Sequence, residues 1–227
     1  SSIDMIQALL KQDKLSKEEI AAMARGKLKR KVDKLVEALN GRMTDHHRFL
    51  LRLHLNDIAF LADQVEEIDR QIQKCMIPFR KEEALILTIP GVNKTSASAI
   101  ISEIGTNMSQ FPTEAHLASW AGMSPGNNES AGVKKSGKIR KGDRYLKAIL
   151  TEVAWAASRT KNSAFSAIYN NIAKRRGKKR ALIAVGHRIL VAVYRALKSC
   201  EPFVDEGAEA VYQRNSKARQ QSAIRLL

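Results

Sequence analysis

The chain has 227 residues, of which 44% are hydrophobic, and a net charge of +16, so it can bury one or two cores and is not expected to be disordered. No apolar run approaches the roughly 18 to 20 residues that span a bilayer, and residues 1–11 lack a signal-peptide pattern, which favours a cytoplasmic protein. The positive charge attracts polyanions, so nucleic acid is the first candidate partner and an anionic membrane surface the second.

The start of the chain, residues 1–43, is predicted to form short helices. Ser16 is followed three residues later by Glu19, the spacing of a capping box in which each side chain bonds the backbone N–H of the other residue. The apolar residues Ile20 and Met23 come directly after this signal. A helix is therefore expected to begin at Ser16.

A long helix is predicted from Thr44 to Ile77, because Thr44 is a suitable N-cap and Pro78 would end the helix. At 1.5 Å per residue it would be about 50 Å long. Its apolar residues recur at alternating steps of three and four, the pattern of a coiled-coil seam. The seam consists of Leu51, His54, Ile58, Leu61, Val65, Ile68, Ile72 and Cys75.

We interpret this helix as a coiled-coil arm that joins copies of the chain into a homo-oligomer. The alternative is a helical hairpin, in which the arm folds against its own chain. Additional apolar residues such as Leu50, Leu53 and Phe60 widen the apolar face and keep that alternative open.

Beyond Pro78, glycine and proline residues separate shorter helices, and strand-like alternation is nearly absent. Helices are expected at about residues 81–87, 94–103, 113–120, 143–159, 164–175 and 179–198. A loop over residues 122–142 interrupts them and is long enough to suggest function rather than mere connection. Residues 206–227 are expected to form a basic, polar tail that frays at its end.

The positive charge is concentrated in one part of the sequence. Residues 130–199 contain 18 Lys and Arg against two acids, a difference that equals the whole excess of 16. The rest of the chain has 21 basic and 21 acidic residues and is neutral. A localised field of this kind favours contact with phosphates, although any single run of lysines can also be an ordinary solvated surface.

Residues 87–101 have the rhythm of a helix-hairpin-helix element. Gly91 and Asn93 tolerate left-handed backbone angles, so the turn could present the free N–H groups of the second helix to a DNA phosphate. Lys94, Thr95 and Ser96 would supply these groups. Such contacts position DNA without reading its bases. A plain helical packing unit is the alternative.

Other polar or aromatic residues carry weaker signals. Lys174, Arg175 and Arg176 open a basic stretch that joins two helices and could grip DNA or RNA, or be solvated. His187 is expected to be packed or hydrogen-bonded rather than catalytic. Trp120 and Trp155 are expected in the core, and no base-stacking platform is predicted, since the basic loop has no aromatic residue.

The loop that begins at Ala121 has the pattern Ala-Gly-x-x-Pro-x-x-x-Glu-Ser-x-Gly, followed by a basic continuation up to Arg144. With the preceding hairpin and the following Tyr145-Leu-Lys-Ala-Ile-Leu and Trp155-Ala-Ala-Ser, this stretch resembles the C-terminal domain of insertion-sequence 110 family transposases. These are serine-dependent recombinases guided by a bridge RNA. The resemblance runs from about residue 15 to residue 205.

The resemblance implies that Ser130 is a nucleophile, which attacks a DNA phosphodiester and holds the broken strand as a phosphoserine. Without the resemblance, Ser124 and Ser136 would rank equally with it, because a serine hydroxyl is weak without an activating base or metal. The cations after the loop would neutralise phosphate charge in the transition state. These cations are Lys134, Lys135, Lys138, Arg140, Lys141 and Arg144.

The resemblance also implies an upstream RuvC-like domain, whose acidic residues bind a divalent metal ion, implied to be magnesium. In this chain the acids before residue 85 fall at capping or coiled-coil positions, without apolar strands around them. Cys75 and Cys200 are far apart and lack metal-ligand spacing. We therefore assign no metal or cofactor to this chain, and expect it to lack that domain and to be inactive alone.

These patterns predict an all-α fold, with short helices in residues 1–43, a coiled-coil arm in 44–80, a helix-hairpin-helix transposase domain in 81–205 and a basic tail in 206–227. The predicted function is DNA binding and strand transfer through a serine nucleophile. The partners would be DNA, a guide RNA and further copies of the chain, and no membrane. A non-enzymatic helix-hairpin-helix DNA-binding protein and an RNA-binding scaffold remain the alternatives.

Overall fold

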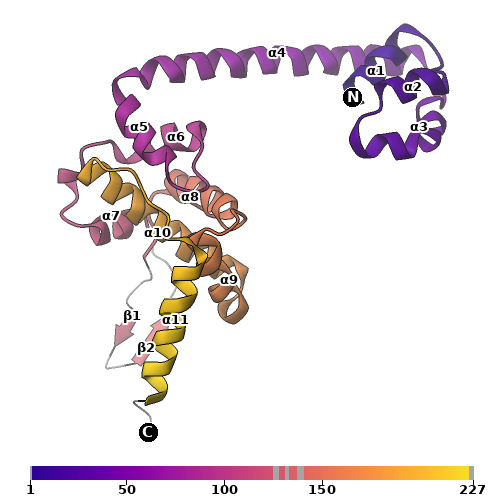
Figure 1. The fold of residues 1–227 in the computed structure, drawn as a ribbon. Helices are drawn as coiled ribbons and strands as arrows, with labels where there is room; N and C mark the ends of the chain where they lie inside the picture. The colour runs from indigo at the N-terminus through magenta and orange to yellow at the C-terminus, as the bar shows by residue number, and fades with distance from the viewer. Residues whose placement is uncertain (1, 125–127, 131–132, 137–140, 225–227) are drawn as a thin grey trace. The chain divides into compact units, whose positions relative to one another are not determined.

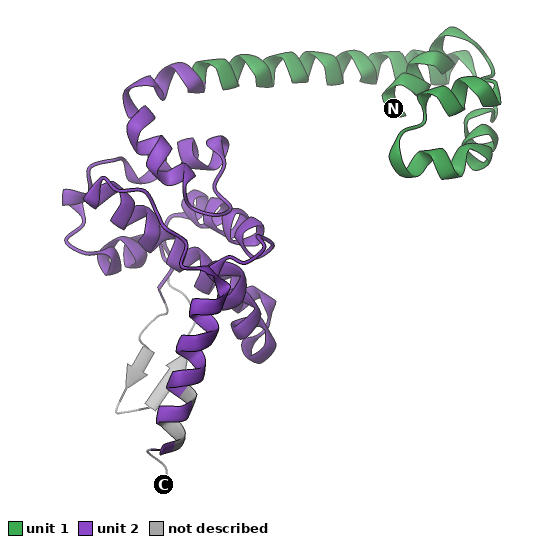
Figure 2. Cartoon of the chain, in the orientation of Figure 1, with its two compact units in different colours: residues 1–71 green, residues 72–227 purple. Residues whose placement is uncertain are grey.

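A computed structural model describes residues 2–124, 128–130, 133–136 and 141–224, drawn as a ribbon in Figure 1. The chain divides into two compact units, Ser1–Gln71 and Ile72–Leu227, which Figure 2 distinguishes by colour. The described residues are mainly helical, and their only strands are two short ones. The all-α prediction is therefore confirmed.

The first unit begins with helices α1 (Ser2–Lys11), α2 (Lys17–Met23) and α3 (Val32–Leu39), with a short 3-10 helix, η1 (Gly26–Lys31), before α3. The predicted capping box is present: Ser16 accepts from the N–H of Glu19, and the Glu19 side chain accepts from the N–H of Ser16. The small core of this unit consists of Met5, Leu9, Leu15, Ile20 and Ala24.

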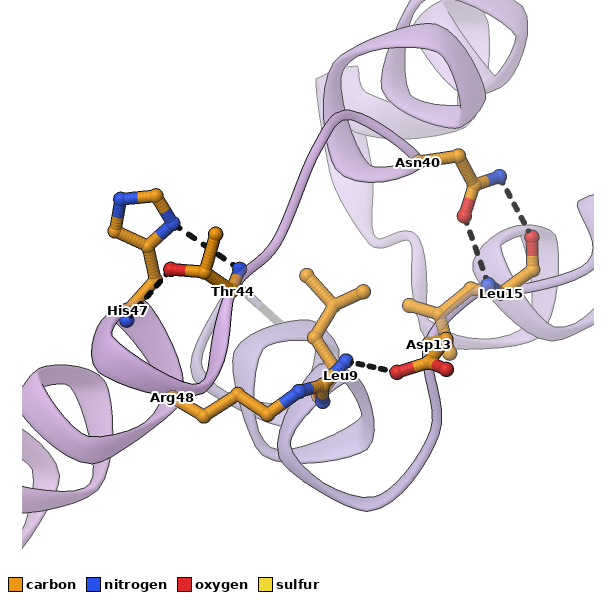
Figure 3. Close-up of polar contacts among 7 residues, drawn as sticks. All are labelled: Leu9, Asp13, Leu15, Asn40, Thr44, His47 and Arg48. Carbon is orange, nitrogen blue, oxygen red and sulfur yellow. Dashed lines mark hydrogen bonds and ion pairs between the residues drawn. The ribbon is translucent and has the colours of Figure 1, made fainter.

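Polar contacts tie the loops of the first unit together (Figure 3). The amide of Asn40 bonds both the backbone N–H and the carbonyl of Leu15, at 2.8 and 2.9 Å. Arg48, in the first turns of the next helix, donates to the carbonyl of Leu9 and pairs with Asp13. The start of that helix is thereby fixed to the three small ones.

Helix α4 (Asp45–Cys75) is 31 residues long, about 46 Å at the usual rise, as the sequence predicted. Thr44 lies directly before it and its hydroxyl accepts from the N–H of His47 at 3.4 Å. No residue of α4 is buried. Four seam residues are more than half exposed: Ile58, Leu61, Val65 and Ile68. The three small helices of the first unit therefore do not cover these residues, and the coiled-coil arm stays a prediction.

The second unit continues from the end of α4 with a 3-10 turn, η2 (Ile77–Phe79), and helix α5 (Arg80–Leu87). Its further helices are α6 (Lys94–Ile104), η3 (Met108–Gln110), α7 (Glu114–Trp120), α8 (Arg144–Ala157), α9 (Ala164–Arg176), α10 (Lys178–Ser199) and α11 (Gly207–Ile224). From α5 to α10 the helix boundaries agree with the sequence predictions to within about three residues.

Helix α10 is the centre of the second unit, and it packs against α5, α7, α8 and α9. Gly186 permits the close approach of α8, because a Cβ there would lie 3.2 Å from the carbonyl oxygen of Leu150. Near the other end of α10 the buried Tyr194 donates its hydroxyl to the carbonyl of Phe111 at 3.0 Å. The core around this helix holds α8, which begins directly after the loop of residues 122–142, in place.

Two segments differ from the sequence predictions. Residues 206–227, predicted as a polar tail, contain helix α11, because Ala208 and Val211 pack on Ala164 and Ala167 of α9. Part of the predicted loop forms two antiparallel strands, β1 (Asn128–Ser130) and β2 (Val133–Ser136). Both are too short to show a periodic sequence pattern.

None of the helices in the described part of the chain combines the length and the apolar composition that crossing a membrane requires.

Candidate nucleic-acid interface

The turn between α5 and α6 is fixed against α8 through Gly91. Its backbone φ of +90° is one that residues other than glycine rarely adopt. A Cβ at this position would lie 2.5 Å from the carbonyl oxygen of Val153 and 2.7 Å from the nitrogen of Ala157. Only glycine therefore fits where the backbone of the turn meets the last turns of α8.

Asn93 differs from the sequence prediction. It has a φ of −117° rather than a left-handed conformation, and it serves as the N-cap of α6. Its side chain accepts from the N–H of Ser96 at 2.8 Å, and the Ser96 hydroxyl accepts from the N–H of Asn93 at 2.9 Å. This capping box occupies the Ser96 N–H, so the N–H groups of Lys94 and Thr95 are left for an outside acceptor.

The loop of residues 122–142 is closed at its base. Gly142 lies so close to the backbone of Ala121 and Gly122 that a Cβ on it would collide with the Gly122 nitrogen. Met123 is buried beneath Gly186, whose hypothetical Cβ would lie 2.7 Å from the Met123 side chain. The two ends of the loop are therefore held together by the core.

Ser130, the predicted nucleophile, is the last residue of β1. It pairs with Val133 of β2, and Glu129 pairs with Lys134. Lys135 follows in β2. Ser130 is thus the last residue of β1 that pairs with β2. The predicted contacts Lys138 and Arg140 lie outside the described residues.

Two carboxyl groups lie together at the start of α8. Asp143 is the N-cap of α8 and accepts from the N–H of Leu146 at 2.6 Å. The Glu103 carboxyl of α6 lies against Asp143, and its pKa is raised above 4.5 by loss of hydration and by the neighbouring negative charge. No local sequence pattern predicts this pair, because the two residues are 40 positions apart.

His187 lies on α10. Its ring is half-buried, and a bond to the carbonyl of Met123 does not offset the burial and the charge of Arg188, so its pKa is lowered below 6.5. Its Nδ1 is buried without a hydrogen-bond partner among the described residues. It lines a pocket of about 770 Å³ together with Ser124 and Arg188. The expectation that His187 is packed or hydrogen-bonded rather than catalytic stays a prediction.

Exposed cations lie at two further places. Lys174, Arg175 and Arg176 end α9, where Gly177 with a φ of +85° turns the chain directly into α10. All three are exposed. Lys141 and Arg144 are exposed at the start of α8, with the Arg144 guanidinium 5.5 Å from the Tyr145 ring. These positions put part of the basic segment at the surface.

The prediction that both tryptophans belong to the core is wrong. Trp120 on α7 is 46% exposed and its ring contacts Phe111, with 5.7 Å between ring centroids. Trp155 on α8 is 42% exposed, and the guanidinium of Arg159 lies 3.8 Å from the centroid of its indole. The apolar pattern of α8 indicated a buried face but did not place Trp155 opposite to it.

A divalent metal is implied for transposases of the resembled class. Within residues 2–124 and 141–224, no three His, Cys, Asp or Glu side chains are grouped closely enough to hold a metal ion. Glu103 and Asp143 form a pair without a third ligand. The described residues therefore do not fit a carboxylate metal centre.

Comparison with known proteins matches residues 83–170 to the model of the transposase IS116/IS110/IS902 family. The chain is also 27% identical over 154 residues to the pilin gene-inverting proteins of Moraxella bovis and Moraxella lacunata. Each match covers 65% of this chain and 48% of the relative, so the chain spans about half the length of these curated relatives. The predicted resemblance to an insertion-sequence transposase is therefore confirmed for residues 83–170, which include the turn at Gly91 and the Ser130 loop.

Proposed function

We propose that this chain is the DNA-gripping and strand-exchange part of a transposase or recombinase. The observation that carries the proposal is the match of residues 83–170 to a transposase family, since that segment contains both the capped start of α6 and the Ser130 loop. The similarity to two gene-inverting proteins supports the same class of reaction.

The grip uses backbone amides and cations. The N–H groups of Lys94 and Thr95 at the start of α6 bind a phosphate, and the turn at Gly91 holds them rigidly on α8. The cations of the basic segment add contacts to neighbouring phosphates, with the release of bound counterions. Contacts of this kind position a duplex without reading its sequence.

Ser130 supplies the reacting oxygen. Its Oγ forms a bond to the phosphorus of a DNA phosphodiester, the bond from phosphorus to one deoxyribose oxygen breaks, and the hydroxyl proton passes to a base. The leaving sugar oxygen takes up a proton, and the strand is held as a phosphoserine until the reverse step joins it to a new end.

Two further parts of the proposal concern partners. The exposed seam of α4 pairs with a second copy of the chain, since isolated apolar seams of this length are stabilised by coiled-coil packing. A guide RNA of the bridge type is the remaining partner, and the basic junction around Arg176 offers it an exposed cationic surface.

A non-enzymatic DNA-binding protein is the second candidate. It is favoured by the capping box and rigid turn at α6, which suffice to bind phosphate, and by the lack of an acidic cluster among the described residues. Substituting alanine for Ser130 separates the two functions, because an enzyme needs the hydroxyl whereas a binding module needs only amides and cations.

The grip is tested by measuring the affinity for duplex DNA at several salt concentrations. We expect a steep loss of affinity with salt, and neutralising Lys134, Lys135 and Lys138 to glutamine should reduce the slope of log affinity against log salt by about 2 to 3. The matched control changes three exposed lysines of the first unit, Lys27, Lys29 and Lys31, and should leave the slope unchanged. A flat salt response of the wild type, or equal changes in both variants, would contradict the proposal.

A further inference from the structure

One face of α8 is not used by the grip. The buried face of this helix consists of Leu146, Leu150, Val153, Ala154 and Ala157. On the opposite side, exposed residues follow at steps of three and four and form a single stripe, which continues into the turn after the helix. The stripe consists of Tyr145, Ala148, Glu152 and Trp155 of α8 and of Arg159, two residues beyond its end.

Each end of this stripe carries an aromatic ring that lies beside a guanidinium group. Tyr145 is 64% exposed, with Arg144 at 5.5 Å from its ring, and Trp155 has Arg159 at 3.8 Å. The second distance is that of direct contact between a flat cation and a ring face. The two rings are ten residues apart, about 15 Å along the helix, a length that about four stacked nucleotides of one strand span.

The charge of the stripe identifies its ligand. Residues 144–161 contain four Lys and Arg and one acid, Glu152. A large exposed aromatic surface held among cations suits a ligand that is flat, aromatic and anionic, whereas an apolar protein partner would meet unpaired charge. Nucleic acid combines these properties, and its bases stack on both aromatic rings and guanidinium planes.

We propose that the stripe on α8, centred on the Trp155–Arg159 pair, is a stacking site for unpaired bases of single-stranded nucleic acid. In a duplex the faces of the bases are covered by their neighbours, so this site selects strands that are open. Glu152 repels phosphates from the middle of the stripe, which turns the bases toward the helix and the phosphates toward the flanking cations.

The stacking site extends the proposed function and rests on it, because strand exchange is the step that exposes unpaired bases. The stacking site and the grip lie on opposite sides of α8: the turn at Gly91 packs on Val153 and Ala157 of the buried face, whereas Trp155 is exposed on the other side. The same helix therefore supports the turn that holds a duplex at the start of α6 and carries the open strand.

The test compares 12-nucleotide oligothymidylate, oligouridylate and a mixed-sequence duplex, with the affinity of each measured at one salt concentration. Trp155→Leu removes the ring but keeps apolar bulk, and should weaken single-strand binding by about 5- to 100-fold while changing duplex binding less than about twofold. Trp155→Phe, the matched control, keeps an aromatic ring and should lose much less single-strand affinity. Tighter binding of the thymidylate or of the uridylate identifies DNA or RNA as the source of the open strand.

Arg159→Lys provides a second variant at an exposed position. It retains the positive charge but not the flat guanidinium. A stacking site therefore predicts weaker single-strand binding by this variant, whereas simple charge attraction predicts unchanged binding. Because the chain has two tryptophans, Trp120→Phe leaves Trp155 as the only one, and its fluorescence should be quenched by the single strand and much less by the duplex.

Equal single-strand affinity of Trp155→Leu and wild type would overturn the stacking site, as would equal losses of single-strand and duplex binding in that variant. Circular dichroism verifies that the helices remain folded. If the wild type fails to bind any duplex, the proposed grip is contradicted; if duplex binding is intact and only the single-strand effects are missing, the stacking site alone is contradicted.

Discussion

Replacement of Gly91 by alanine tests how the turn before α6 is held on α8. The left-handed backbone costs an alanine about 1 to 2 kcal/mol. The new Cβ would also lie 2.5 Å from the oxygen of Val153 and 2.7 Å from the nitrogen of Ala157. Both are backbone atoms that cannot rotate away, and overpacking of this kind costs a further 1 to 3 kcal/mol or so. We therefore expect the free energy of unfolding to fall by about 2 to 5 kcal/mol.

Gly177→Ala is the matched control. Gly177 has a φ of +85°, close to that of Gly91, but a Cβ there would meet no atom within 4 Å. Its ψ of 159° puts its backbone in a region that is essentially restricted to glycine, so Gly177→Ala should show only a backbone cost of about 1 to 3 kcal/mol. The gain from a less flexible unfolded chain is common to both variants and cancels in the comparison.

Urea unfolding followed by tryptophan fluorescence measures both variants, because Trp120 and Trp155 belong to the second unit. We also expect Gly91→Ala to weaken duplex binding, since the start of α6 must move when the turn is displaced, whereas Gly177→Ala should not displace α6. Equal destabilisation by the two substitutions would refute the close packing of the turn on α8.

Three further outcomes follow from the arm and from the two titrating groups. Ile58→Lys with Val65→Lys puts charge into the exposed seam of α4 and should convert an oligomer into monomers by light scattering; an unchanged mass with intact helices would contradict the coiled coil. Glu103→Gln should raise the melting temperature at pH 7 by up to about 4 °C, because it removes a carboxylate repelled by Asp143. The pKa of Glu103 is raised, so this gain should disappear as the pH falls below 4.5, and a gain that is independent of pH would count against the repulsion. The lowered pKa of His187 predicts that the protein loses stability as the pH falls below 6.5 and that the His187→Gln variant loses less. The same dependence of stability on pH in the two proteins would show that the burial of His187 has no such effect.

The helices of the second unit could be predicted because glycine and proline separate them and because their apolar residues face one core. Helix α11 was missed, since its contact with α9 depends on few apolar residues, chiefly Ala208 and Val211. The strands β1 and β2 are three and four residues long, too short for alternation to stand out from a loop.

Much of the candidate site depends on contacts between distant residues, which no local pattern encodes. Asn93 was expected in a left-handed turn, but its side chain finds the N–H of Ser96 and caps the helix instead. The closed base of the Ser130 loop needs Gly142 to meet Gly122 across the loop. Trp155 is exposed because the opposite face of α8 packs on the core, and the composition of that helix does not reveal which face is buried.

The central claim is that Ser130 forms a covalent bond to DNA. The most direct measurement is denaturing electrophoresis of the chain, supplied with a RuvC-like domain and incubated with DNA substrate, magnesium and guide RNA, compared with its Ser130→Ala variant. We predict a protein–DNA adduct that survives denaturation in the wild type and is missing in Ser130→Ala, while the two proteins bind duplex DNA equally. Adducts that persist in Ser130→Ala and vanish on substitution of Ser124 or Ser136 would contradict the assignment of the nucleophile. Adduct formation that depends on no serine would contradict the serine mechanism as a whole.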